Sequence, residues 1–201
     1  GYNALAGTIA GGEYNVAIGN YSLDALTSGD NNVAIGYQAG SAITTGGPNV
    51  AVGSSALAAN TTGSTNTAVG YESLKSNTTA SHNTGFGWKT LTANTTGDLN
   101  TAVGYGALIS NITGDRAVAI GVDALGSQNV SGDTYNVGVG YNAGNAITTG
   151  TKNVAVGGLT LDATDTGNEN TAIGHQALTS DTKGNRSVAV GAGALETQNF
   201  T

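Results

Sequence analysis

The chain has 201 residues, among them 33 glycines and no cysteine or methionine, and its formal net charge is −7. Charged residues make up 9% of the chain and hydrophobic residues 38%, which is too little charge and too much apolar content for a disordered segment. The negative charge argues against a nucleic-acid partner, and no apolar run approaches the roughly 18 residues of a membrane-spanning helix, so we expect no membrane insertion.

A glycine that closes the phrase "AVG", "AIG" or a close variant recurs along the whole chain. It returns every 17 residues, apart from an opening interval of 18 residues and one later interval of 19. A fixed period of this length indicates a repeat architecture. We therefore predict one repeat domain over residues 1–201, with about eleven to twelve coils. The repeated glycines are Gly1, Gly19, Gly36, Gly53, Gly70, Gly87, Gly104, Gly121, Gly140, Gly157, Gly174 and Gly191.

Each unit is numbered from this glycine as position 1. Positions 14 to 17 read Asn, Val or Thr, Ala, and Val or Ile, and this alternation with period two is typical of a strand. Position 5 is usually Leu and is expected in a short second strand after a corner, whereas positions 9 to 13 are rich in Asn, Thr and Gly, as turns are. The first strand of each unit is expected at 15–18, 32–35, 49–52, 66–69, 83–86, 100–103, 117–120, 136–139, 153–156, 170–173 and 187–190.

These elements predict an all-β fold, a parallel β-solenoid or β-roll with 17-residue coils. A helix is a poor alternative, because each unit carries two glycines and each costs about 1 kcal/mol relative to alanine. The sequence from Gly36 resembles the sequence from Gly140, which suggests that a block of six coils was duplicated. The irregular coil at 121–139 is expected to contain a bulge or a longer loop around Asn129 to Tyr135. The chain opens inside a repeat without Met, so we expect it to be part of a longer or processed protein.

The interior is predicted from two substitutions. Two units have Gly40 and Gly144 instead of Leu at position 5, and the same units gain Ile43 and Ile147 at position 8. This exchange keeps the apolar volume nearly constant, as a packed interior requires. Positions 1, 4, 5 and 14 to 17 carry no charge in any unit. We predict an interior of Val or Ile at position 17, Leu at position 5 and part of position 15.

With that interior, the small residue at position 16 would point away from the core. A small residue repeated at the same outer position of every coil suggests close approach by a second copy of the chain. A steric alternative is that a narrow coil leaves room for alanine alone. The candidate chain–chain seam consists of Ala17, Ala34, Ala51, Ala68, Ala102, Ala119, Ala155, Ala172 and Ala189.

Position 2 carries an interrupted column of aromatic residues. Such a column could stack on sugars, or each ring could shield its own corner and pack on its neighbours. The candidate ligand-facing residues are Tyr2, Tyr37, Tyr71, Trp88, Tyr105 and Tyr141. The asparagines of position 14 are interpreted instead as a structural ladder, in which amides hydrogen-bond from coil to coil.

The sequence predicts no catalytic residues, no metal site and no cofactor. The two histidines, His82 and His175, lie in different coils, and no cysteine is available as a nucleophile. Asp162 and Asp165 are close in sequence but occupy turn positions, and the remaining acidic residues are scattered. We therefore expect this chain not to be an enzyme.

The phrases "NVAIGYQA", "AVAIGVDAL" and "SVAVGAGAL" carry a family resemblance. They resemble the head repeats of YadA-like trimeric autotransporter adhesins, and "NTAVGYGALISNITG" is similar to repeats of phage tail fibres. The resemblance covers the whole chain, although the period of 17 residues and the "NTTG" turn depart from the adhesin heads. It implies a left-handed parallel β-roll that forms homotrimers.

The functional hypothesis is a structural and binding segment of an extracellular trimeric fibre, from a phage tail or a bacterial cell surface, that attaches to a cell surface. Its expected partners are further copies of itself and a surface glycan. The alternative is a monomeric solenoid that binds a repeating surface such as ice. The stacked pairs Thr61–Thr62, Thr78–Thr79 and Thr95–Thr96 motivate this alternative.

Overall fold

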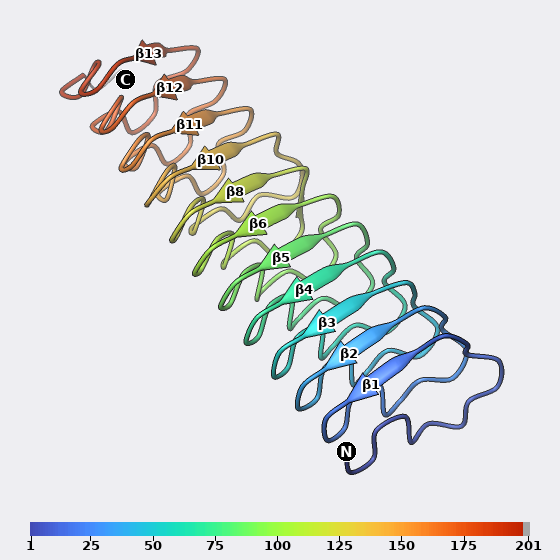
Figure 1. The fold of residues 1–201 in the computed structure, drawn as a ribbon. Helices are drawn as coiled ribbons and strands as arrows, with labels where there is room; N and C mark the ends of the chain where they lie inside the picture. The colour runs from blue at the N-terminus through green and yellow to red at the C-terminus, as the bar shows by residue number, and fades with distance from the viewer. Residues whose placement is uncertain (199–201) are drawn as a thin grey trace.

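A computed structural model describes residues 1–198 and has the architecture of a parallel β-solenoid. Eleven strands form one parallel sheet in the order β1-β2-β3-β4-β5-β6-β8-β10-β11-β12-β13, and Figure 1 shows them stacked along a rod. The described part of the chain contains no helix. The bounds are β1 Val16–Ile18, β2 Val33–Ile35, β3 Val50–Val52, β4 Thr67–Val69, β5 Thr84–Phe86, β6 Thr101–Val103, β7 Gly114–Asp115, β8 Val118–Ile120, β9 Gly132–Asp133, β10 Val137–Val139, β11 Val154–Val156, β12 Thr171–Ile173 and β13 Val188–Val190.

Each strand pairs with its own copy one coil further along the chain. Ala34 of β2 lies opposite Ala51 of β3, and Thr84 of β5 lies opposite Thr101 of β6. The period of the sequence therefore sets the register of the sheet, and the predicted solenoid is confirmed. Among residues 1–198 we find no helix of the length and apolarity needed to cross a membrane.

The glycine at position 1 is required by both backbone conformation and stacking. Gly70 has φ +129°, a conformation that L side chains rarely adopt. A Cβ atom there would lie 2.3 Å from the carbonyl oxygen of Gly87 in the next coil. Coils can stack at this corner because both residues lack a side chain.

The expected second strand at position 5 is absent, because this position is a turn residue in the left-handed region. Leu57 has φ 51° and Leu74 has φ 51°. This conformation costs a non-glycine residue of the order of 1 kcal/mol. It lets the Leu57 N–H donate to the carbonyl of Ser73 one coil on, at 3.1 Å. Each corner is thus joined to the next by backbone hydrogen bonds outside the sheet.

The leucines of position 5 form the centre of the interior, as predicted. They are fully buried along the rod, and they pack with the residues of position 4 and position 16. The eight with no exposed surface are Leu23, Leu57, Leu74, Leu91, Leu108, Leu125, Leu161 and Leu178.

The predicted orientation of the main strand is wrong. Position 16 faces the interior, and positions 15 and 17 face outward. Ala68 and Ala102 have no exposed surface, whereas Ile18 is 57% exposed and Phe86 is 55% exposed. The space between the strand and the opposite Leu admits a methyl group and little more, so the steric explanation for the repeated alanine fits.

The two units without Leu confirm the predicted exchange of volume. Ile43 and Ile147 are buried, with 1% and 0% of their surface exposed. A Cβ atom on Gly40 would lie 2.9 Å from the Cδ1 atom of Ile43. A Cβ atom on Gly144 would lie at the same distance from Ile147 Cδ1. The isoleucine therefore occupies the space that Leu fills in the other coils.

The other half of the interior is polar and consists of asparagine ladders. Asn83 Nδ2 donates to the Gly97 carbonyl at 2.7 Å, and its Oδ1 accepts from the Asn100 backbone N–H at 2.9 Å. A second ladder runs along position 8, where Asn77 Nδ2 donates to Asn60 Oδ1 at 3.0 Å. The predicted ladder of position 14 is confirmed, and the side chains that form it are buried because they serve the backbone of the next coil.

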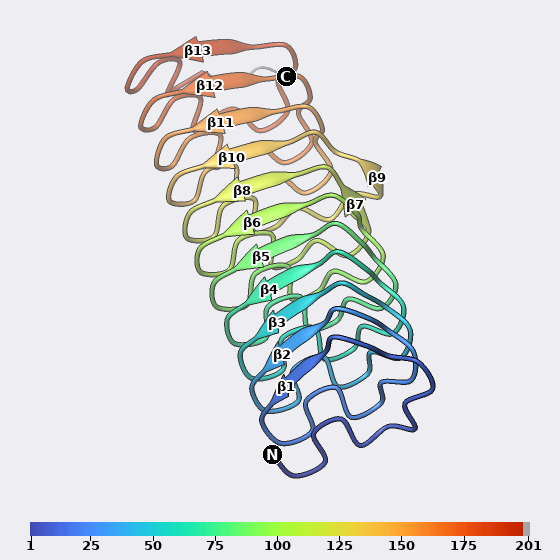
Figure 2. The same ribbon diagram turned by 45° about the vertical axis from the view of Figure 1, so that its right-hand side comes forward.

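The coil from Gly121 to Gly140 is longer than the others. In it β9 pairs with β7 of the preceding coil, and Figure 2 shows this pair projecting from the side of the rod. Tyr135 donates from its hydroxyl to Asp133 at 2.9 Å, and Arg116 forms an ion pair with the same carboxylate. The loop is therefore held against the adjacent coil by polar contacts.

Candidate functional site

The outward residues of the eleven strands form one continuous, mainly apolar surface, here called the Val/Ile face. It has two parallel rows, from positions 15 and 17, and no charged residue in either row. Its most exposed members include Val190 at 67% and Phe86 at 55%. The face consists of Val16, Ile18, Val33, Ile35, Val50, Val52, Thr67, Val69, Thr84, Phe86, Thr101, Val103, Val118, Ile120, Val137, Val139, Val154, Val156, Thr171, Ile173, Val188 and Val190.

The Val/Ile face is comparable in size to the largest apolar patch of an ordinary monomeric protein. Eleven strands spaced about 4.8 Å apart give a length of about 50 Å, and two rows about 7 Å apart give a width of roughly 10 Å. The resulting area of roughly 500 Å² lies within the range of about 300–600 Å² for such patches. The largest apolar patch of a protein is often a functional surface.

The alanines predicted as the chain–chain seam lie beneath this face. Eight of them, Ala34, Ala51, Ala68, Ala102, Ala119, Ala155, Ala172 and Ala189, are at most 2% exposed, and Ala17 in the first coil is partly buried. Their side chains contact the interior of their own coil, so they are not available to a second chain. Two features of the sequence are consistent with this orientation but do not decide it. Position 16 varies only to Gly85 and Gly138, whereas position 17 accepts Phe86.

The aromatic column lies at a separate edge of the coils, and the structure brings only part of it together. Trp88 and Tyr105 stack with parallel rings 4.4 Å apart, and Tyr71 stacks on Trp88 at 6.1 Å. Tyr2 and Tyr37 instead make edge contacts with Tyr21, a residue of position 3.

The rings of this column remain partly open to solvent. Trp88 is 37% exposed, Tyr105 49%, and Tyr141, which makes no ring contact with another aromatic residue among those described, 57%. Because Trp88 is stacked between two tyrosines, it presents mainly its edge outward. A ligand that stacks on a ring face would therefore find that face at the ends of the Tyr71–Trp88–Tyr105 stack.

Three charged side chains lie near the stack. Lys89 Nζ lies 4.4 Å from the centre of the Trp88 ring. Glu72 accepts a hydrogen bond from Lys75 Nζ at 2.7 Å and lies 3.5 Å from Lys89 Nζ. The hydrogen bond from Lys75 lowers the pKa of the Glu72 carboxyl, so this group stays ionised beside the stack.

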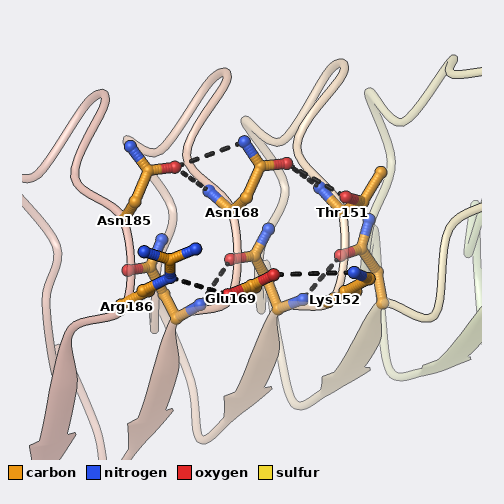
Figure 3. Close-up of polar contacts among 9 residues, drawn as sticks. Thr151, Lys152, Asn168, Glu169, Asn185 and Arg186 are labelled. Atoms are coloured by element: carbon orange, nitrogen blue, oxygen red, sulfur yellow. Dashed lines mark hydrogen bonds and ion pairs between the residues drawn. The ribbon is translucent and has the colours of Figure 1, made fainter.

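A polar groove of about 420 Å³ runs along positions 12 and 13 near the end of the rod. One wall is a ladder in which Asn185 Oδ1 accepts from the Asn168 N–H, and Asn168 Oδ1 accepts from the Thr151 N–H, both at 2.8 Å (Figure 3). The other wall is a row of ion pairs, in which Glu169 lies 2.9 Å from Arg186 Nε and 3.5 Å from Lys152 Nζ. Arg186 lowers the pKa of the Glu169 carboxyl.

The ladder of position 12 was not predicted and extends through most of the rod. Ser64 N–H donates to Ser81 Oγ at 3.0 Å, and Asp98 N–H donates to Asp115 Oδ1 at 2.7 Å. The sequence signal was present, because position 12 is Asp, Asn, Ser or Thr in nearly every unit, and each of these side chains offers an acceptor oxygen. The groove is thus built from residues that first serve the stacking of the coils.

The threonine pairs that motivated ice binding are divided between two roles. Thr61 Oγ1 donates to the Thr78 carbonyl at 3.1 Å, and Thr78 Oγ1 donates to the Thr95 carbonyl at 3.0 Å. Thr62 and Thr79, the second members of their pairs, are exposed. Only one hydroxyl of each pair therefore faces solvent.

Asp162 and Asp165, which are close in sequence, have different surroundings. Burial raises the pKa of the Asp162 carboxyl, while Asp165 accepts a hydrogen bond from Thr148. Within residues 1–198, no three His, Cys, Asp or Glu side chains are grouped closely enough to hold a metal ion.

Comparison with protein-family models, curated proteins and solved structures finds no match to this chain. The Val/Ile face extends over all eleven strands of the sheet, and the aromatic stack and the polar groove lie outside its two rows.

Proposed function

We propose that this chain is a rod-shaped segment of a homotrimeric extracellular fibre, from a phage tail or a bacterial cell surface, that attaches to the surface of a cell. Copies of the chain lie side by side and bury their Val/Ile faces against one another. The observation that carries this proposal is the uncharged apolar surface over all eleven strands. Burial of such a surface is favourable by about 25 cal/mol per Å².

A second copy fits this face better than an unrelated partner. The face repeats with the coil spacing, and an identical chain repeats with the same spacing, so contacts can continue over the whole length of about 50 Å. Its area of roughly 500 Å² approaches the roughly 800 Å² that each partner contributes to a stable interface, and the rims of the coils add to it. The number of three chains comes from the resemblance to trimeric adhesin heads.

The aromatic stack is the proposed site of attachment to a surface glycan. Sugar rings present C–H groups that pack on aromatic faces, and the hydroxyl groups of a sugar can bond to the nearby Glu72 and Lys89. Trp88 is the single tryptophan of the chain, so its fluorescence reports on the stack directly. Host polysaccharide that binds here should shift that emission, and Tyr105→Ala, which opens one face of Trp88, should change the affinity.

Light scattering after size exclusion tests the assembly. The expected mass is three times the 19.6 kDa of one chain. The double variant Val103→Lys with Ile120→Lys places charges in the face and should give monomers with an unchanged circular dichroism spectrum. The control, Thr79→Lys with Thr96→Lys, adds the same charge at exposed turn positions and should remain trimeric.

A monomeric parent chain would refute the fibre proposal. It would favour the second candidate, in which a single solenoid binds a repeating surface such as ice. The observation in favour of that candidate is the row of exposed threonines at position 10, including Thr62 and Thr79, repeated at the coil spacing. A thermal-hysteresis assay on the monomer would test it, and a chain without activity would exclude it.

A further inference from the structure

A repeated face cannot by itself determine how far along the rod one copy lies relative to another. If a neighbouring chain shifts by one coil, Val and Ile residues still meet Val and Ile residues. Such a shift leaves one coil of each chain uncovered at either end, and it changes the buried area little. A fibre of defined structure therefore needs a feature of the Val/Ile face that does not repeat.

The non-repeating feature lies on β4, β5 and β6. Phe86 of β5 is the one aromatic residue of the Val/Ile face, and it is 55% exposed. Its neighbours in the same row are Val69 and Val103, which pair with it in the sheet. A large planar side chain thus interrupts a row of small branched ones.

The second row changes over the same three strands. Thr67, Thr84 and Thr101 are consecutive members of position 15 and pair with one another in the sheet. Val50 precedes them and Val118 follows them. Their side chains point out of the coil and are partly exposed. Three polar groups therefore lie beside Phe86, in a row whose other members are seven valines and Thr171.

We infer that Phe86 sets the register between copies of the chain. The inference depends on the proposed side-by-side assembly. When parallel copies at the same height surround a common axis with the row of position 17 nearest to it, Phe86 meets Phe86 of its neighbours, and aromatic side chains pack favourably with one another.

Any shift by one coil removes this match. Phe86 would then lie against Val69 or Val103 of the neighbouring chain, where the larger ring overfills the space. An antiparallel pair centred on itself would instead bring β5, the fifth strand, against β8, the seventh, so that Phe86 meets Ile120.

Cysteine cross-linking can test the inference, because the chain contains no cysteine of its own. Val103→Cys and Ile120→Cys occupy the same row on neighbouring strands β6 and β8. Chains with either cysteine, one of them carrying a size tag, are co-expressed, purified as assemblies and oxidised. Links between equal positions report the in-register assembly, and links between positions 103 and 120 report a shift by one coil.

With Phe86 present, links between equal positions should predominate. With Phe86→Val, which installs the residue found in several other coils, the 103–120 fraction should rise at least fivefold while the mass of the assembly stays the same. The control Ile35→Val also removes bulk from an exposed position of the same row and should leave the fraction unchanged.

Three results would overturn the inference. An unchanged 103–120 fraction in Phe86→Val assemblies would show that the register is set elsewhere. Links at 103 without links at 120 would indicate antiparallel packing. A parent chain that is monomeric by light scattering would refute the proposed function, and the register inference with it, so the two failures are distinguishable.

Discussion

Replacement of Asn83 by alanine should destabilise the solenoid far more than the same replacement of Asn185. Both asparagines accept a hydrogen bond from a backbone N–H in another coil, at 2.9 Å and 2.8 Å. They differ in burial, because Asn83 has no exposed surface and Asn185 is exposed. Comparison of the two variants therefore separates the contribution of a buried amide to stability from that of an exposed amide.

The expected loss of stability in Asn83→Ala follows from the groups that lose a hydrogen-bond partner. Asn83→Ala leaves the Asn100 N–H with no acceptor, and an unsatisfied buried donor costs about 1–3 kcal/mol. The Gly97 carbonyl loses one donor but keeps Asn94 Nδ2 at 2.9 Å, so this loss adds only about 1 kcal/mol. We expect a decrease of about 2–4 kcal/mol in the free energy of unfolding. For Asn185→Ala, water replaces the lost acceptor, and the change should stay within about 0.5 kcal/mol.

Urea unfolding followed by circular dichroism measures both values. All proteins should be compared at one chain concentration, since self-association would couple to unfolding. A lower midpoint with an unchanged slope would report stability alone. Equal losses in the two variants, or a loss below about 1 kcal/mol for Asn83→Ala, would refute the argument that buried asparagines maintain the stacking.

Three further predictions address the interior, the corner and an ion pair. Ala102→Leu should lower the free energy of unfolding by about 1–3 kcal/mol through overpacking, whereas the outward Val103→Leu adds no bulk to the interior and should change it less, in thermal melts at one chain concentration. Gly70→Ala should cost more than about 1 kcal/mol in urea unfolding, because a Cβ atom meets a carbonyl of the next coil and φ is positive; a stable variant would contradict the stacking argument. Lys75 lowers the pKa of Glu72, so this ion pair stabilises the fold above the ordinary carboxyl value of 4.5 and is lost as the pH falls below it. Glu72→Gln should remove that small acid-dependent component, about 1 kcal/mol at most, and identical pH profiles for parent and variant would exclude it.

Much of the fold could be predicted from the repeat. The 17-residue spacing predicts which residues pair, because parallel strands in a stack of equal coils can only meet their own copies. The exchange of Leu for Gly144 and Ile147 in one unit correctly predicted that positions 5 and 8 lie in the interior, since volume has to be conserved there. Most of the aromatic column was also evident, although the participation of Tyr21 was not.

The direction of the strand could not be decided in the same way. Alternation separates positions 14 and 16 from positions 15 and 17, but it does not say which pair faces inward. Hydrophobicity favours Val and Ile inside and Asn outside, and that choice was wrong. Asparagine is tolerated inside because the stacked coils offer each amide a carbonyl and an N–H at fixed distance, as for Asn83.

The sequence by itself therefore determined the period, the main strand of each coil, its register and the leucine centre, which all depend on local spacing and on equal coils. Only the tertiary structure decided which face of the strand is buried. The reason is physical: the narrow space opposite Leu accepts a methyl group and not a larger side chain, and the backbone groups that satisfy asparagine exist only after the coils have stacked. The apolar face left outside follows from these two constraints.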